Sequence, residues 1–224
     1  MDNKEHYTRE SLLGEGGMGK VYLATDNQLQ RQVAIKELTY LAEESDSNSA
    51  LNEARLLARV SHANIIQIYN VHDDNDHISL VMEYFKSKPL TQFQQEHYCT
   101  LTQKIELLQQ LSAGLAAAHK NNVIHCDLKP TNILVDEQGL LKITDFGIAL
   151  LATNDANATD NNMLAQASDT TDTQVYGSLL YMSPEQIQGK TLDYRSDIFS
   201  LGIVAYQLMV GSHPFGRGSA TDIG

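Results

Sequence analysis

Alternating apolar and polar positions dominate the first forty residues of the chain. Between residues 7 and 40 this alternation runs around glycines, most clearly at 21–24 (VYLA) and 33–37 (VAIKE), and it predicts antiparallel strands joined by short turns. The pattern changes over residues 50–60, where good helix formers carry an apolar stripe at i, i+3 and i+4 spacing. One helix inserted among strands is therefore expected.

The remaining two thirds of the chain become increasingly helical. Strand patterns return at 65–71 and 77–85, on either side of the polar turn 72–76, and a long amphipathic helix is predicted over 101–119. Three short apolar segments then predict brief strands at 123–125, 133–135 and 141–144. The last strong pattern is a helix over 196–210, apolar on all sides as in a fully buried helix. A mostly β half followed by a mostly α half predicts an α+β fold.

Composition narrows the class of protein. The 224 residues include 42% apolar and 20% charged side chains, which suffices for a core and disfavours a disordered tail. With 16 basic and 28 acidic side chains the net charge is −12, so we expect no nucleic-acid partner. Two cysteines form neither a disulfide framework nor a zinc motif, and no segment has the length and hydropathy of a signal or a membrane span. We expect a soluble, cytoplasmic protein without a membrane segment.

A glycine-rich segment is the first candidate for chemistry. In Gly14-Glu-Gly-Gly-Met-Gly19 the glycines let backbone amides approach phosphate oxygens closely. Such a motif alone is also compatible with an ordinary hairpin turn. A dinucleotide fold needs a helix directly afterwards, whereas residues 21–25 continue as a strand, so we expect a hairpin that covers phosphates. Lys36 follows in the next strand, where an isolated lysine would more often be solvated.

A second cluster of motifs resolves this ambiguity. Residues 125–132 read His-Cys-Asp-Leu-Lys-Pro-Thr-Asn, Asp145-Phe-Gly follows, and Ser-Pro-Glu stands at 183–185 before the apolar helix that contains Asp197. With these motifs the chain resembles the eukaryotic-type (Hanks-type) serine/threonine protein kinases of the bacterial branch, from about Tyr7 to its last residue.

The resemblance implies a two-lobed α+β kinase fold. The N-lobe, β-rich with one helix, would comprise residues 7–84, and residues 85–224 would form a mainly α-helical, partial C-lobe without the last helices of the family. We therefore expect the 224 residues to be a fragment of a longer kinase, or to need a partner that covers the exposed apolar helix over 196–210.

The resemblance also assigns catalytic and metal-binding roles. Asp127 would accept the proton of a substrate hydroxyl, Lys129 would hold the γ-phosphate, and Asn132 and Asp145 would bind Mg²⁺ (or Mn²⁺). Lys36 would hold the α- and β-phosphates of ATP. The remaining catalytic assignment is Glu53, in the inserted helix, as the ion-pair partner of that lysine.

The nucleotide site is assigned in the same way. The segment from Leu13 through Gly14, Glu15, Gly16, Gly17, Met18, Gly19 and Lys20 to Val21 would cover the phosphates and adenine, and Ala34 and Leu134 would contact the adenine faces. The backbone carbonyl of Glu83 and the amide of Phe85 would bind the ring edge. Four residues, Leu57, Ile68, His125 and Phe146, would stack into the family's regulatory spine.

The sequence departs from the family at the activation segment. Cys126 stands where the family has an arginine that binds the activation-loop phosphate, and the segment 143–189 contains no basic residue. Activity is therefore expected to be independent of loop phosphorylation. Cys126 could alternatively serve as a redox switch, although a small buried residue is the better interpretation. Ser178 replaces the family's threonine and keeps the hydroxyl.

Three functions remain open on the sequence. The favoured interpretation is an active kinase that phosphorylates a protein on serine or threonine, since all charged catalytic positions are present. The alternatives are a pseudokinase that binds ATP as a scaffold, inactive because its C-lobe is incomplete, and a small-molecule phosphotransferase of related fold.

Overall fold

The computed structural model describes residues 6–16, 19–38, 58–73, 78–146 and 178–216. These residues divide into two compact units. The first unit contains the described residues up to His62 together with Ile66–Lys86, and the second contains Ala63–Ile65 and the described residues from Ser87 onward. The inserted helix expected over 50–60 lies mostly outside the described residues.

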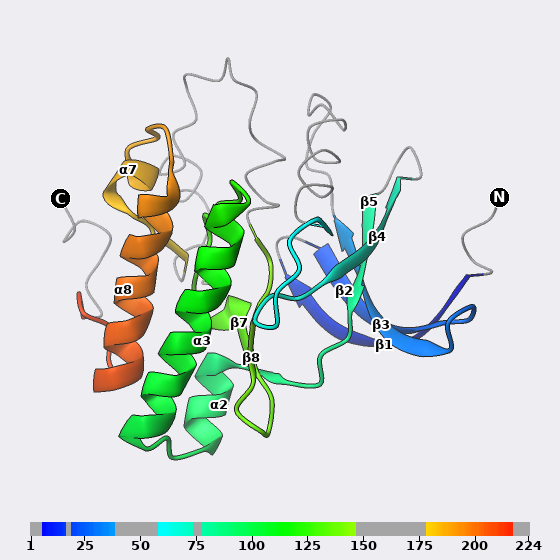
Figure 1. Cartoon of the computed structure of the whole chain (residues 1–224), viewed down its shortest axis with the longest axis horizontal. Helices are drawn as coiled ribbons and strands as arrows, with labels where there is room; N and C mark the ends of the chain where they lie inside the picture. Colours follow the sequence, from blue (N-terminus) through cyan, green and yellow to red (C-terminus); the bar gives the residue numbers. More distant parts are fainter. Residues whose placement is uncertain (1–5, 17–18, 39–57, 74–77, 147–177, 217–224) are drawn as a thin grey trace. The chain divides into compact units, whose positions relative to one another are not determined.

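The first unit is built on an antiparallel sheet in the order β1-β2-β3-β5-β4 (Figure 1). Its strands are β1 (Tyr7–Gly16), β2 (Gly19–Asp26), β3 (Arg31–Leu38), β4 (Ile68–Asp73) and β5 (Ile78–Glu83). One face buries a cluster of Ala24, Val33, Ile35 and Val81 against Tyr7. The structure thus confirms the alternating pattern of residues 7–40 and the strand that continues after the glycines.

The strand expected at 65–71 begins three residues later. Ile65 forms an isolated parallel bridge with Ile143, and the Asn64 side chain donates to the carbonyl of Leu141 at 2.8 Å and to the Gln110 side chain at 3.0 Å. These contacts assign residues 63–65 to the second unit. Strand β4 therefore starts later than the apolar pattern predicts, because the side chain of Asn64 binds the backbone of Leu141 in the second unit.

The second unit is mainly helical, as the resemblance implies, and carries one small sheet (Figure 1). Its elements are β6 (Lys88–Pro89), α2 (Leu90–Glu96), α3 (Leu101–Lys120), the 3₁₀ turn η2 (Pro130–Asn132), β7 (Ile133–Val135), β8 (Leu141–Ile143), α7 (Pro184–Ile187) and α8 (Tyr194–Val210). A capping box between Thr100 and Gln103 starts α3. The structure confirms the helix over 101–119 and both strands of β7 and β8.

One expected strand is absent: residues 123–125 form no strand. Val123 and His125 are buried, so the apolar pattern was real. However, the amide of His125 donates to the carboxylate of Asp197 at 2.8 Å rather than to a neighbouring strand. The buried Asp197 side chain thus binds the backbone group that a neighbouring strand would bind in a β-ladder.

Close packing of α3 depends on Gly114. A Cβ built on this residue would lie 2.8 Å from Cδ1 of Ile143 and 2.9 Å from the carbonyl oxygen of Asn64. The backbone atom cannot yield as a flexible side chain can. Helix α3 therefore approaches β8 and residues 63–65 more closely than any larger residue would permit.

We expect Gly114→Ala to lower the free energy of unfolding by about 1–3 kcal/mol, because overpacking outweighs the higher helix propensity of alanine. Thermal denaturation of the variant measures this. Gly202→Ala in α8 is the matched control, since a Cβ there meets no atom within 4 Å. That variant should gain about 0.5–1 kcal/mol. Equal stabilisation in both variants would contradict the packing argument.

Helix α8 has two different faces. Asp193 caps its start by accepting from the amide of Arg195, and Gly211 ends it in a left-handed conformation with φ of 86°. The inner face buries Ser196, Asp197, Ser200, Ile203, Val204 and Leu208. The outer face exposes large apolar side chains, among them Ile198 (50% exposed) and Val210 (58%). The exposed large apolar side chains of α8 are Tyr194, Ile198, Tyr206, Met209 and Val210.

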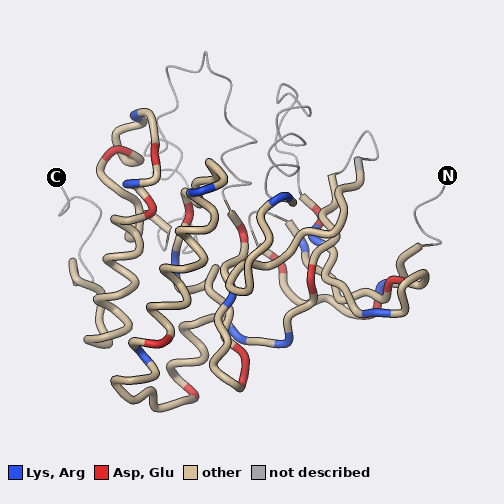
Figure 2. The backbone as a smooth tube through the Cα atoms, viewed as in Figure 1, with Lys and Arg blue, Asp and Glu red and all other residues tan. Residues whose placement is uncertain are grey.

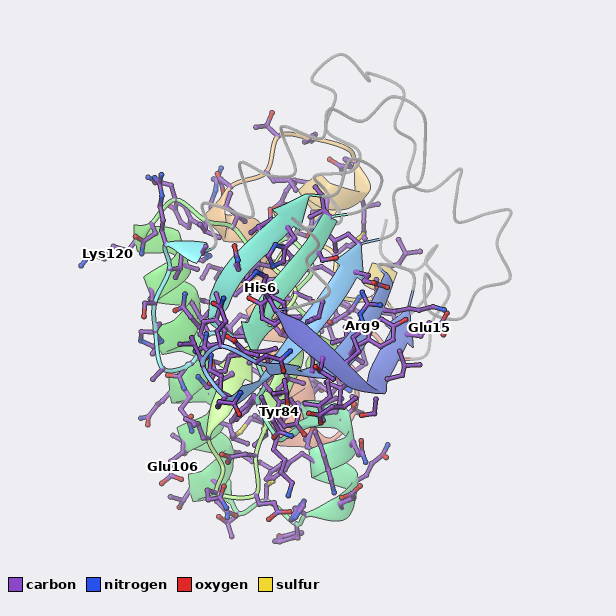
Figure 3. The ribbon with its side chains drawn as sticks, turned by 90° about the vertical axis from the view of Figure 1, so that its right-hand side faces the viewer. His6, Arg9, Glu15, Tyr84, Glu106 and Lys120 are labelled. Carbon is purple, nitrogen blue, oxygen red and sulfur yellow. The ribbon has the colours of Figure 1, made fainter. Side chains whose placement is uncertain are left out.

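Charged residues of both signs are interspersed along both units (Figure 2). On the second unit, Glu106 and Lys120 project outward from α3 (Figure 3). Among the described residues, no helix has both the length and the apolar character needed to span a bilayer.

Candidate active site

The candidate catalytic residues of the second unit form one hydrogen-bonded cluster. The Lys129 ammonium lies 2.8 Å from Oδ2 of Asp127 and donates to the Ser178 hydroxyl at 2.7 Å. Nδ2 of Asn132 donates to the main-chain oxygen of Asp127 at 2.9 Å and to its Oδ2 at 3.0 Å. The loop between His125 and η2 thus presents a carboxylate, a cation and an amide at one place, and Ser178 joins them as expected for a retained hydroxyl.

Residues of the catalytic loop, of the segment after Ser178 and of α8 meet at a crevice that has no room for a water molecule. Its lining residues are Cys126, Asp127, Leu128, Ser178, Tyr181, Met182 and Ser200. The segment that follows Ser178 is fixed to α8 by two hydrogen bonds: the Tyr181 hydroxyl donates to Gln207 at 2.6 Å, and the Ser200 hydroxyl donates to the carbonyl of Tyr181 at 2.7 Å. Residues 178–182 are therefore held in place next to the candidate base.

Asp197 anchors the loop from within α8. Its side chain is 1% exposed and accepts from the amides of His125 at 2.8 Å and Cys126 at 2.9 Å. A carboxylate in an apolar helix needs such partners. These two hydrogen bonds tie the loop before Asp127 to α8.

His119 completes the Asp197 contacts, a role that was not recognised in the sequence. Its Nε2 lies 2.7 Å from Oδ2 of Asp197. The signal was its position: Leu111, Leu115 and His119 follow one another at i+4 spacing, so His119 ends the buried stripe of α3. A polar residue at such a position implies a buried polar partner.

Cys126 has a left-handed backbone with φ of 62°. This conformation costs a residue with a Cβ about 1–2 kcal/mol, so surrounding contacts must hold it. The side chain is half-buried, so it is more exposed than the small buried residue expected from the sequence.

His125 is fully buried, and its tautomer follows from its contacts. Nδ1 accepts from the amide of Asp127 at 3.2 Å, and Nε2 lies 3.0 Å from the carbonyl of Thr144, to which it must donate. Burial lowers the pKa of His125, and the nearby carboxylate of Asp197 opposes this only in part. The ring packs on Phe146 with centroids 4.6 Å apart. The neutral His125 ring thus connects the loop that carries Asp127 with residues 144–146 on either side of Asp145.

The lowered pKa of His125 predicts a pH-dependent stability. As pH falls below about 6.5, the unfolded histidine binds a proton before the folded one does, so the free energy of unfolding decreases. Above that pH this contribution stays constant. We expect denaturant titrations at pH 5.5 and 7.5 to differ more for the wild type than for His125→Phe, which keeps a ring against Phe146 but cannot titrate. Equal pH slopes in the two proteins would contradict the neutral-histidine assignment.

Asn132 and Asp145 are suited to a hard cation. Both hydrogen bonds of the Asn132 amide come from its nitrogen, which leaves its oxygen as the atom that can ligate a metal. The amide of Thr144 donates to the carbonyl of Asn132 at 3.0 Å, so Asp145 follows directly from a residue bonded to Asn132. Within the described ranges, no three His, Cys, Asp or Glu side chains cluster as a metal site. The oxygens that these two residues could offer to a hard cation are the Asn132 amide oxygen and the Asp145 carboxylate.

Lys36 in the first unit is buried, not solvated: it is 3% exposed. The register pairs Val21 with Lys36 and Ala34 with Met82. Paired residues and residues two apart share a face of a sheet, so Val21, Ala34, Lys36 and Met82 lie on one face. A buried lysine next to apolar positions is rare unless its charge is compensated. The alternative of an ordinary solvated strand lysine is therefore excluded.

The described glycines of the glycine-rich segment lie at the end of β1 and at the start of β2. Gly14 pairs with Val21 and Gly16 with Gly19, which has φ of 120°. The exposed Leu13 falls at an irregularity of the pairing, and Lys20 lies 3.3 Å from Glu15. A Cβ on Gly14 would meet no atom within 4 Å, so open space lies over this strand.

The other assigned positions are divided between the two units. The amide of Glu83 donates to the carbonyl of Gln67 at 2.8 Å at the end of β5, and Phe85 follows in the first unit. Leu134 lies in β7 of the second unit, opposite Pro89. Four positions lie outside the described residues: Gly17, Met18, Glu53 and Leu57.

The Glu185 carboxylate is bound by a hydroxyl of α8, and the nearby Arg195 has another partner. Arg195 instead pairs with Asp193 at 2.8 Å. The carboxylate of Glu185 accepts from the Ser196 hydroxyl at 2.6 Å, and this hydrogen bond lowers the pKa of Glu185. The described partner of this carboxylate is thus a neutral donor from α8.

Comparison with known proteins identifies relatives of the whole chain. The protein kinase domain family matches residues 7–223. Serine/threonine-protein kinase PrkC of Bacillus subtilis is 35% identical over 222 residues, which cover 95% of this chain and 31% of PrkC. A probable serine/threonine-protein kinase of Clostridium acetobutylicum is 38% identical over 212 residues, 93% of this chain and 30% of that protein.

A third relative, the probable serine/threonine-protein kinase PknB of Lactococcus lactis, is 35% identical over 215 residues, 94% of this chain and 32% of PknB. The chain therefore spans about a third of the length of these curated relatives.

Proposed function

We propose, because this chain belongs to the protein kinase domain family, that it transfers the γ-phosphate of ATP, with Mg²⁺ or Mn²⁺, to a serine or threonine hydroxyl of a protein. The observation that carries the proposal is the cluster of Asp127, Lys129 and Asn132, held by the buried Asp197. Phosphoryl transfer needs mainly positioning and charge compensation, and this cluster offers both.

Each described residue has a defined task in this proposal. Asp127 accepts the hydroxyl proton, and Lys129, which already lies between Asp127 and Ser178, compensates charge on the transferred group. Asn132 and Asp145 hold the metal ion, which supplies charge neutralisation at the phosphates when bound. Lys36 holds the nucleotide phosphates from the first unit.

Lobe boundaries and nucleotide contacts belong to the same proposal. Residues 7–84 would form the N-lobe and residues 85–224 the available part of the C-lobe. Val21, Ala34 and Leu134 would contact adenine, and Glu53 would orient Lys36. A pseudokinase scaffold is the second candidate, and the apolar outer face of α8 favours it because this face needs a covering protein. For the kinase function, which is the alternative to the scaffold, we propose instead that a further C-terminal segment covers that face.

Two substitutions test the nucleotide and metal assignments. We expect Asp145→Ala to abolish magnesium-dependent ATP binding, because it removes the carboxylate ligand, whereas Lys36→Met should weaken orientation of the phosphates and retain measurable binding. Calorimetry with and without Mg²⁺ measures both, and transfer of radiolabelled phosphate to a mixed protein substrate reports activity. Wild-type phosphotransfer in both variants would refute the site.

A further inference from the structure

Both backbone groups of Cys126 are bound by side chains from other segments. Its amide donates to Oδ1 of Asp197 at 2.9 Å, and its carbonyl accepts from Nε2 of Gln186 at 2.6 Å. These two hydrogen bonds hold Cys126, which has a left-handed backbone and directly precedes Asp127. Asp197 comes from α8, whereas Gln186 comes from α7.

Gln186 is itself rigidly held. It is 8% exposed, and its Oε1 accepts from the amide of Ser183 at 2.9 Å. The backbone amide of Gln186 donates to the Ser183 hydroxyl at 3.4 Å, which completes a capping box. The side-chain oxygen is thus used at the helix start and the side-chain nitrogen at the catalytic loop. An amide is the one ordinary side chain of this length that can accept at one end and donate at the other.

We propose that Gln186 is a positioning residue for the catalytic loop. By fixing the Cys126 carbonyl it maintains the left-handed backbone that sets the direction of the Asp127 side chain. The inference rests on the proposed phosphotransfer for its effect on rate. It also links α7 to the candidate base through one side-chain amide, that of Gln186.

The test compares two variants of Gln186 with two controls. Gln186→Glu keeps the oxygen that accepts from Ser183 but removes the donor to Cys126, and Gln186→Met removes both. Ser183→Ala weakens the helix cap and leaves the Cys126 bond intact. Gln188→Glu introduces the same charge at an exposed position at the end of α7.

We expect both Gln186 variants to lose about tenfold in kcat, the effect of one lost buried hydrogen bond, with KM for ATP within about twofold of wild type. Rates are normalised to nucleotide-binding sites, so that misfolded protein does not contribute. Both controls should keep kcat within about twofold. Unchanged kcat in Gln186→Met, or an equal loss in Ser183→Ala, would overturn the proposal.

Alkylation of Cys126 gives a readout that does not depend on activity. N-ethylmaleimide labelling, followed by peptide mass spectrometry, compares Cys126 with Cys99, which serves as internal reference. A loosened loop should raise the Cys126 rate several-fold in both Gln186 variants and leave Cys99 unchanged. An inactive wild type in which Cys126 responds in this way would refute the proposed phosphotransfer but retain the positioning role; an unaltered Cys126 rate would refute that role.

Discussion

Replacing Asp127 with asparagine is expected to lower kcat about a thousandfold, in the range that a general base contributes, while KM for ATP stays within about twofold. Asparagine has the same shape as aspartate. In the wild-type protein the Lys129 ammonium and the Asn132 side-chain nitrogen lie 2.8 and 3.0 Å from Oδ2 of Asp127, and the asparagine oxygen can take the place of that atom. Only the charge and the proton-accepting capacity disappear. Single-turnover transfer from radiolabelled ATP measures the loss.

This variant also separates the two candidate functions. A kinase should lose activity without losing nucleotide affinity, and Asp136→Asn, in the turn before β8, should behave as wild type. If the wild-type protein and Asp127→Asn transferred phosphate equally, the catalytic assignment would be wrong. If neither transferred phosphate but both bound ATP, the scaffold function would be supported instead.

Asp197→Asn is expected to destabilise the second unit by about 2–3 kcal/mol, because a carboxylate that accepts from three donors becomes an amide whose nitrogen must face one of them. The three donors are the amides of His125 and Cys126 and the ring of His119. Since these donors hold the loop that carries Asp127, kcat should also fall by at least about tenfold. Denaturant unfolding and single-turnover kinetics give the two numbers.

The control for this prediction lies on the same helix. Asp193 caps α8 through its side chain, and asparagine is an equally good cap, so Asp193→Asn should change stability by less than about 0.5 kcal/mol. Comparable losses in the two variants would mean that Asp197 acts only as a helix-start charge and not as an anchor of the catalytic loop.

The sequence predicted those features whose signal is local. Alternation identified β2 and β3, amphipathic spacing identified α3, and the motif around Asp127 identified the cluster with Lys129 and Asn132. Each of these signals is carried by residues that are near neighbours in the chain.

Features that depend on distant partners were not predictable in this way. The roles of His119 and Gln186 arise from hydrogen bonds to residues 78 and 60 positions away. The apolar run at 123–125 read as a strand because nothing local shows that Asp197 binds its backbone. Long-range polar contacts of this kind leave only a weak trace, such as a histidine at the end of an apolar stripe.

Residues 63–65 bear on the order in which the chain acquires its structure during synthesis. The strands β1, β2 and β3 pair with sequence neighbours and can form as soon as they leave the ribosome, because local contacts require little loop closure. Asn64, by contrast, bonds to Leu141, 77 residues later. The contacts of this segment with β8 therefore cannot form until β8 has been translated, and a pause in translation before residue 141 would prolong the lifetime of the incompletely anchored state.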